Sequence, residues 1–164
     1  MTRSKKEQAG KTYRLACKRV LAVASGGGHW IQLMRMRPAF DDAKTVFVSV
    51  DKDQAAEVSP NRFYKVPEGN RDTKLSLIWM AFKLLLIIAW ERPHVVISTG
   101  AAQGYFACRM GRWFGARTLF IDSVANGEQL TLSAQLATRH ATKVLSQWES
   151  VAKKAGVDYR GSCL

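Results

Sequence analysis

A chain of 164 residues can form one α/β domain with a substantial core, but it is too short for two complete ones. A reaction that needs two such domains would therefore need a second protein. The hydrophobic fraction of 47% and the charged fraction of 23% exclude a disordered chain. The net charge of +12 indicates binding to an anionic partner, either lipid headgroups or nucleic acid phosphates, unless the excess positive charge belongs only to a solvated basic tail.

Half of that positive charge lies in residues 1–19, which contain seven Lys and Arg side chains and one acid, Glu7. We expect residues 1–18 to form a basic tail and residues 19–164 to form the domain. No apolar stretch that resembles the core of a secretion signal occurs before Arg19, so nothing indicates export. Tyr13 is the only aromatic residue of the tail, whereas a surface that binds nucleic acid strands would interleave several.

The cysteines Cys17, Cys108 and Cys163 are odd in number and lack CxxC spacing. No histidine is placed to complete a metal-binding set with them. We interpret all three as reduced thiols in a cytosolic compartment.

Short apolar segments alternate with helical segments along the chain. Strands are predicted at residues 19–25, 44–50, 62–66, 94–98, 118–122 and 143–146. Helices are predicted from residue 29, at 73–92 before Pro93, from the turn at 99–100 to 110, at 129–141, and up to about 155. This alternation predicts βαβ units, and hence a Rossmann-like parallel sheet with helices on both faces. Residues 157–164 could form an edge strand or a docking segment for a partner.

The helix predicted at residues 73–92 is apolar on nearly every side. Its apolar part, residues 75–90, would be about 24 Å long, shorter than the ~30 Å hydrocarbon core, and Lys83 would lie near its middle. We therefore do not expect it to span a membrane. It could be a crossover helix packed on the sheet, or one whose outer face also enters the lipid interface. The second interpretation assigns membrane contact to Leu77, Trp79, Phe82, Leu86 and Trp90.

A run of glycines follows the first predicted strand. The turn is Ser25, Gly26, Gly27 and Gly28, and His29 comes next. Glycine lets a phosphate approach the backbone N–H groups at a helix start, although the run could equally be a tight turn. The pattern is neither GxGxxG nor a P-loop, so a dinucleotide or nucleoside triphosphate site is poorly supported. His29 could accept a proton from an attacking hydroxyl, or it could be structural.

A second turn follows the fourth predicted strand. It contains Ser98, Thr99, Gly100, Gln103 and Gly104. Two such turns at one sheet edge would form a crevice suited to a diphosphate, unless both are ordinary βα turns. Asp122 ends the next strand and Glu128 lies in the loop after it, where either carboxylate could act on a ligand or cap a helix.

In this order the segments resemble the amino-terminal half of MurG-type glycosyltransferases of the GT-B class. They are more similar still to separate acceptor-binding subunits of split enzymes. These include the endoplasmic reticulum subunit that pairs with a catalytic partner to add the second N-acetylglucosamine to dolichol diphosphate, and bacterial exopolysaccharide proteins of the PssD type. The resemblance covers about residues 19–160. It rests on the glycine turn with His29, on residues 90–97, 98–100, 121–123 and 128–133, and on Trp148.

The resemblance implies a membrane-associated subunit that presents a polyprenyl diphosphate-linked sugar while a partner subunit binds the UDP-sugar donor. The two turns would line the acceptor diphosphate. His29, Asp122 and Glu128 would be the candidates for orienting or deprotonating the acceptor hydroxyl. No bound metal or other cofactor is implied by the resemblance. We therefore expect a hexosyltransferase subunit, active only with its partner, in exopolysaccharide or related glycan biosynthesis.

The resemblance also bears on anchoring. The eukaryotic subunits begin with a membrane-spanning helix, whereas this sequence begins with a basic tail, so we expect a bacterial type. It would attach to the cytoplasmic face of the plasma (inner) membrane as a peripheral or monotopic protein, through the tail and residues 75–90. Two alternatives are a self-sufficient nucleotide-binding enzyme and a basic module that binds nucleic acid; for the preferred function no nucleic acid partner is expected.

Overall fold

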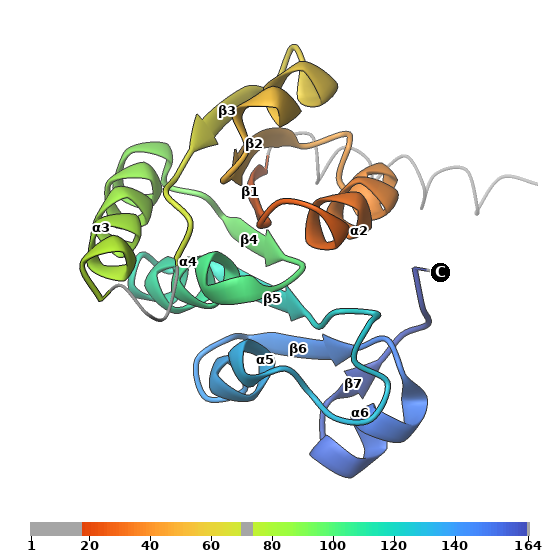
Figure 1. Ribbon diagram of the computed structural model, residues 1–164. Coiled ribbons are helices and arrows are strands. Elements are labelled where there is room, and N and C mark those ends of the chain that lie inside the picture. Colours follow the sequence, from red (N-terminus) through yellow and green to blue (C-terminus); the bar gives the residue numbers. More distant parts are fainter. Residues whose placement is uncertain (1–17, 70–73, 164) are drawn as a thin grey trace, which may run out of the picture.

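The computed structural model describes residues 18–69 and 74–163, so the predicted tail lies outside the described residues except for Lys18 (Figure 1). Seven parallel strands form one sheet in the order β3-β2-β1-β4-β5-β6-β7. The strands are β1 (Arg19–Val23), β2 (Lys44–Ser49), β3 (Arg62–Lys65), β4 (Val95–Ser98), β5 (Arg117–Ile121), β6 (Lys143–Ser146) and β7 (Asp158–Tyr159). The helices are α2 (Gly28–Met36), α3 (Lys74–Glu91), α4 (Ala101–Trp113), α5 (Leu132–Ala137) and α6 (Glu149–Ala155), with 3₁₀ helices η1 (Arg37–Ala39) and η2 (Lys52–Val58).

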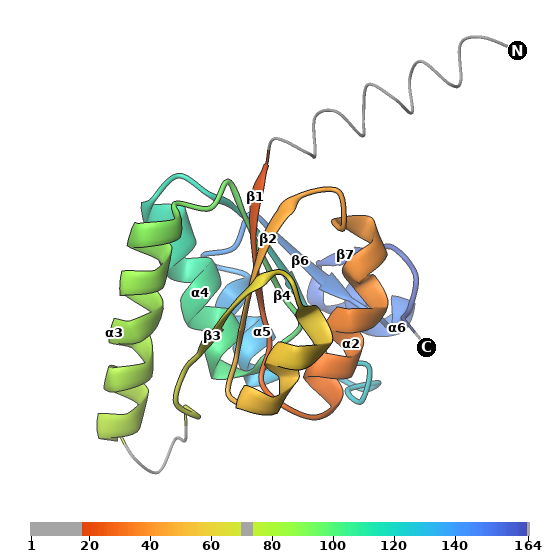
Figure 2. The same cartoon turned by 90° about the horizontal axis from the view of Figure 1, so that it is seen from above.

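Helices cover both faces of the sheet. The chain winds from β1 toward β3 and then returns to wind from β4 toward β7. Because crossovers between parallel strands are right-handed, the two directions of winding place their helices on opposite faces. Figure 2 shows α2 on one side of the sheet and α3 with α4 on the other. The predicted Rossmann-like parallel sheet is therefore confirmed.

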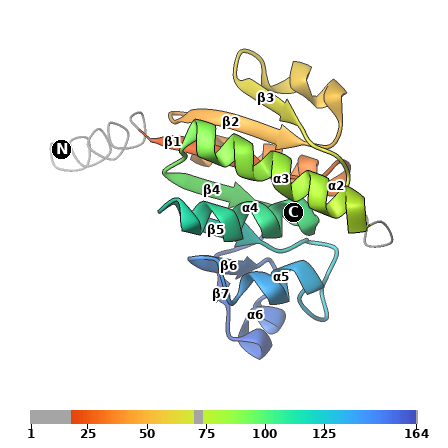
Figure 3. The ribbon, with the colours of Figure 1, turned by 90° about the vertical axis from the view of Figure 1, so that its left-hand side faces the viewer.

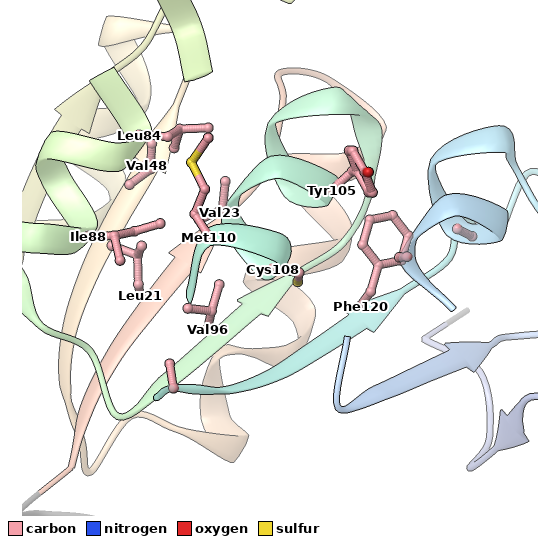
Figure 4. Packing of buried hydrophobic residues seen from close by; sticks show 14 of the residues in the cluster. Leu21, Val23, Val48, Leu84, Ile88, Val96, Tyr105, Cys108, Met110 and Phe120 are labelled. Carbon is pink, nitrogen blue, oxygen red and sulfur yellow. The ribbon is translucent and has the colours of Figure 1, made fainter. Parts of the chain in front are cut away.

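Strand β1 contributes to both halves of the core because its side chains alternate between the faces. Val20 and Ala22 belong to the cluster that includes Trp30 of α2. Leu21 and Val23 belong to the larger cluster beneath α3 and α4, which Figure 4 shows from close by. Burial on both faces explains why β1 is a continuous apolar run.

Two predicted elements end differently in the structure. The helix expected at residues 129–141 is the shorter α5, which begins at Leu132 because Thr131 caps it: the Thr131 side chain accepts a hydrogen bond from the N–H of Ala134. Within the segment of residues 157–164, Asp158–Tyr159 form the short edge strand β7 beside β6, and the alternative of a docking segment stays a prediction.

Helix α3 is the crossover from the edge strand β3 to β4, and it lies along the outside of the molecule (Figure 3). Met80, Leu84 and Ile88, spaced four residues apart, are buried against the sheet. The outer face exposes Leu75, Ile78, Trp79, Phe82, Leu86 and Trp90. Leu77 was predicted to lie on the membrane-contacting face, but it is partly buried and packs against the core instead. Among the described residues, no helix has both the length and the apolar character needed to cross a membrane.

Two of the three cysteines can be placed. Cys108 is buried and Cys163 is half-buried, and neither forms a disulfide. Burial raises the pKa of the Cys108 thiol to about 12, so this side chain stays protonated. Cys17 lies outside the described residues.

The end of α3 is tied to β3 through Glu91. Arg62 Nη1 and the Tyr64 hydroxyl each donate a hydrogen bond of 2.7 Å to Glu91 Oε1. Burial raises the pKa of Glu91, but the hydrogen bonds from Tyr64 and Arg62 and the charge of Arg62 outweigh it, and the net pKa is lowered. A lowered pKa in the folded state means that the ionised carboxylate stabilises the fold.

We expect Glu91→Gln to lower the melting temperature near neutral pH by about 2–4 °C, because the charged acceptor is lost. The contribution of Glu91 is present above its unfolded pKa of about 4.3 and disappears as the pH falls through the lower folded value. The difference in melting temperature between the two proteins, measured by thermal unfolding at a series of pH values, should therefore disappear at acidic pH. Asp41→Asn, which breaks an exposed ion pair with Arg37, is the control and should change little. A difference that is constant with pH would contradict this role of Glu91.

Candidate functional site

The two glycine turns meet where the winding of the sheet reverses. Strands β1 and β4 are neighbours, yet the turn after β1 leads to α2 on one face and the turn after β4 leads to α4 on the other. Beside the carboxyl ends of strands at such a reversal, α/β proteins typically bind their ligands, and we refer to this place in the fold as the crevice. The structure thus brings together the two turns that the sequence places 70 residues apart.

Reciprocal hydrogen bonds join these turns. The Nδ1 atom of His29 lies 2.8 Å from the carbonyl oxygen of Thr99, and the Thr99 hydroxyl donates to the carbonyl oxygen of His29 at 2.7 Å. Because a carbonyl oxygen only accepts, Nδ1 is the donor, and in the neutral ring Nε2 is left as the unprotonated nitrogen. Among the described residues, nothing forms a hydrogen bond with Nε2. His29 is therefore oriented as a proton acceptor.

Gly100 makes this arrangement possible. A Cβ atom at this position would overlap the imidazole ring of His29, and the backbone has a φ of +137°, which side chains rarely adopt. Ala101, the next residue, also has a positive φ of +61°. For a residue other than glycine this conformation is uncommon, and it occurs preferentially where function constrains the backbone.

Both helices begin at the crevice with free N–H groups. Gly27 precedes α2 and Gly100 precedes α4, and neither helix start has a side-chain cap. The first N–H groups of a helix have no partner within it, and the helix dipole adds positive potential there. Gly27 and Gly28 are exposed, with nothing within 4 Å of where a Cβ atom would stand. This turn therefore offers the accessible backbone that a phosphate requires.

The residues of the second turn divide into two groups. Ser98 and Gly104 are buried, and a Cβ atom at Gly104 would overlap the Ser98 side chain. The Ser98 hydroxyl accepts a hydrogen bond of 3.2 Å from the N–H of Gly100, so these two residues support the turn from behind. Gln103, in the first turn of α4, is also buried, but its Oε1 atom has no hydrogen-bond partner among the described residues.

Sequence reasoning missed two further polar residues. The side-chain oxygens of Ser49 and Gln54 are buried without a partner among the described residues, and Gln54 Nε2 lies 3.9 Å from where a Cβ atom of Gly26 would stand. An unpartnered buried polar atom is costly and calls for a ligand or an ordered water. Because Gln54 lies in the 3₁₀ helix η2, far from any recognisable motif, no sequence signal marks it.

Asp122, the second candidate acid or base, contacts Thr131. Its two carboxylate oxygens accept hydrogen bonds from the hydroxyl of Thr131 at 2.6 Å and from its N–H at 3.0 Å. The carbonyl oxygen of Asp122 accepts from the amides of Gln32 and Gln147. Asp122 is buried, and its hydrogen bonds with Thr131 close the loop of residues 122–131.

Glu128, the remaining predicted acid or base, is exposed on that loop. It lines an open pocket beside Trp148. Of the three candidates, only His29 lies between the two turns. Within residues 18–69 and 74–163, no three His, Cys, Asp or Glu side chains gather in a way that could hold a metal ion.

Comparison with solved structures identifies the architecture. The domain superposes on MurG from Acinetobacter baumannii with a TM-score of 0.68 and 12% sequence identity, over 82% of this chain and 43% of that one. The fold is that of one half of a GT-B enzyme. A UDP-N-acetylglucosamine 2-epimerase from Rickettsia bellii matches with a TM-score of 0.70 and 13% identity, over 89% of this chain and 45% of that one. A glycosyltransferase from Rickettsia africae matches with a TM-score of 0.62 and 14% identity, over 86% of this chain and 40% of that one.

This chain therefore spans less than half the length of these GT-B neighbours. No family model matches the sequence, and no curated protein matches it. At such low identity the likeness establishes the fold alone. Because transferases and epimerases share that fold, the chemistry has to be argued from the site.

We expect Gly100→Ala to lower the free energy of unfolding by about 1–3 kcal/mol, because the new methyl group overlaps the His29 ring and the backbone is strained. Urea unfolding of the two proteins measures this. Gly28→Ala, at an open position in the first turn of α2, is the matched control and should stay within about 0.5 kcal/mol of the parent protein. Equal stability of all three proteins would mean that the His29 ring is not held against Gly100.

Proposed function

We propose that this domain is the acceptor-binding half of a glycosyltransferase and that a separate polypeptide supplies the half that binds the UDP-sugar donor. The acceptor is a polyprenyl diphosphate-linked saccharide in exopolysaccharide or related glycan biosynthesis. One observation carries the proposal: His29, with Nδ1 committed to Thr99, lies between two uncapped helix starts. A proton acceptor beside an anion site is what transfer to a diphosphate-linked hydroxyl needs.

In the proposed reaction the acceptor diphosphate lies on the N–H groups of the glycine turn at Gly27 and Gly28. Nε2 of His29 takes the proton from the acceptor hydroxyl while the oxygen of that hydroxyl forms a bond to the anomeric carbon of the donor sugar. The bond from that carbon to UDP breaks, and UDP leaves with the electron pair. The Thr99 carbonyl, which accepts from Nδ1, stabilises the imidazolium that forms.

The lipid part of the acceptor requires a membrane surface, and α3 supports that requirement. Its exposed apolar face includes stacked Trp79 and Phe82 rings, 5.8 Å apart, with the Lys83 ammonium 5.6 Å from the centre of the Trp79 ring. Exposed Trp113 and Phe114 at the end of α4, which packs against α3, extend the aromatic surface and were missed by sequence reasoning. Aromatic rings mixed with cations suit the headgroup region of a bilayer.

Leu86→Glu should weaken binding of the full chain to phosphatidylglycerol-containing vesicles by about tenfold or more, since a leucine that would enter the lipid interface is replaced by a negative charge. Vesicle co-sedimentation measures the effect. Ile31→Glu is the control, because Ile31 of α2 is 56% exposed on the other face of the sheet and Leu86 is 52% exposed. An equal loss in both variants would indicate a general effect of charge and not a docking face.

His29→Ala should lower transfer to a polyprenyl diphosphate sugar by about 100-fold or more when the chain is combined with its donor-binding partner, because the general base is lost. The assay follows release of UDP, and co-purification of the two chains checks that the complex is intact. His140→Ala removes a half-buried histidine outside the crevice and should leave the rate unchanged. Unchanged turnover in His29→Ala would remove His29 from the mechanism. Complete turnover by this chain alone would instead favour a self-sufficient enzyme.

A further inference from the structure

An open pocket of about 460 Å³ lies beyond the crevice, beside the loop that follows β5. It is lined by Ala125, Asn126, Gly127, Glu128, Gln129 and Trp148. The lining thus combines one aromatic ring with one carboxylate and two amides, and it contains no cation. A few polar groups around an aromatic wall are typical of a small-molecule site.

The aromatic wall is held rigidly. The indole N–H of Trp148 donates a hydrogen bond of 2.8 Å to the carbonyl oxygen of Val124, and its backbone N–H donates to the hydroxyl of Ser146 at 3.1 Å. Even so, 37% of Trp148 is exposed. Because its only side-chain donor is already used, what the residue offers to a ligand is the surface of its ring.

Gly127 leaves space against that ring. A Cβ atom at this position would lie 3.4 Å from Cε2 and 3.7 Å from Cδ2 and Cζ2 of Trp148, which is ordinary van der Waals contact. The backbone of Gly127 is not among those with a positive φ. Neither packing nor backbone conformation therefore requires glycine here, and its effect is to keep the ring surface open.

The loop that carries the pocket is fixed at both ends. The carboxylate of Asp122 holds Thr131, and Gln32 of α2 accepts a hydrogen bond of 3.3 Å from the N–H of Val124. The pocket is therefore preformed, and it is joined to the same helix whose first residues form the crevice.

We infer that this pocket binds a neutral pyranose ring of the acceptor saccharide, stacked on Trp148. The inference rests on the proposed function and adds a sugar subsite to it. The C–H groups on one face of a pyranose carry partial positive charge and fit the electron-rich face of an indole. Its hydroxyls can pair with Glu128 and with the amides of Asn126 and Gln129. A nucleotide could stack too, but its phosphates would meet a carboxylate and no cation.

The test uses the purified chain with ¹⁵N-labelled tryptophan, without partner or donor. Methyl glycosides of glucose and of N-acetylglucosamine are the probes, and the indole N–H resonance of Trp148 is the readout. At least one glycoside should shift this resonance saturably. Gly127→Ala should weaken that binding by about tenfold, because the methyl group occupies the stacking space. His140→Ala, which removes a half-buried aromatic ring outside this pocket, should leave it unchanged.

Several outcomes would overturn the subsite. These are no shift with either glycoside, a shift with uridine 5′-monophosphate only, or equal binding by the parent chain and Gly127→Ala.

Failure of this binding test would leave the acceptor-half proposal intact, because the test involves no transfer. In the reconstituted enzyme, Gly127→Ala should raise the KM for the acceptor more than it lowers kcat, whereas His29→Ala should lower kcat. Glycoside binding without any transfer by the reconstituted pair would instead refute the proposed function.

Discussion

The reciprocal hydrogen bonds between His29 and Thr99 are the contact on which the candidate site depends. They hold the ends of β1 and β4 together at the point where the sheet reverses its winding. The same contact commits Nδ1 of the imidazole to a carbonyl oxygen, so that Nε2 is the nitrogen free to take a proton. It can form only because Gly100 leaves room for the ring. The packing of the His29 ring against Gly100 and the choice of Nε2 as its unprotonated nitrogen thus have one origin.

The winding of the sheet also separates two kinds of surface. The carboxyl edge carries the uncapped helix starts and the pocket beside Trp148, whereas the outer face of α3 carries an apolar stripe. Helix α3 has two apolar faces because it packs inward through one and exposes the other. An amphiphilic acceptor, with a lipid tail and a charged head, would match this division. Glu91 holds the end of α3 to β3 and so keeps the exposed stripe in place.

The two carboxylates near the carboxyl edge have different surroundings and therefore different roles. Asp122 is buried and accepts a hydrogen bond from Thr131 at each carboxylate oxygen, so it shapes the loop. Glu128 is exposed on that loop and borders the pocket beside Trp148. Of the three predicted acids and bases, this leaves His29 as the one that lies between the two turns. Under the proposed function, the reacting hydroxyl lies near His29 and a second sugar ring lies against Trp148.

The sequence by itself determined the fold class, the positions of the strands and the two glycine turns, because these follow from local apolar runs and from glycine's backbone freedom. It also singled out His29. Only the tertiary structure decided that Thr99 orients the imidazole, that Asp122 is committed to Thr131, that Leu77 faces inward, and that Gln54 lies beside the first turn. Each of these depends on which residues from distant segments meet, and the packing of helices on the sheet decides that, not local sequence.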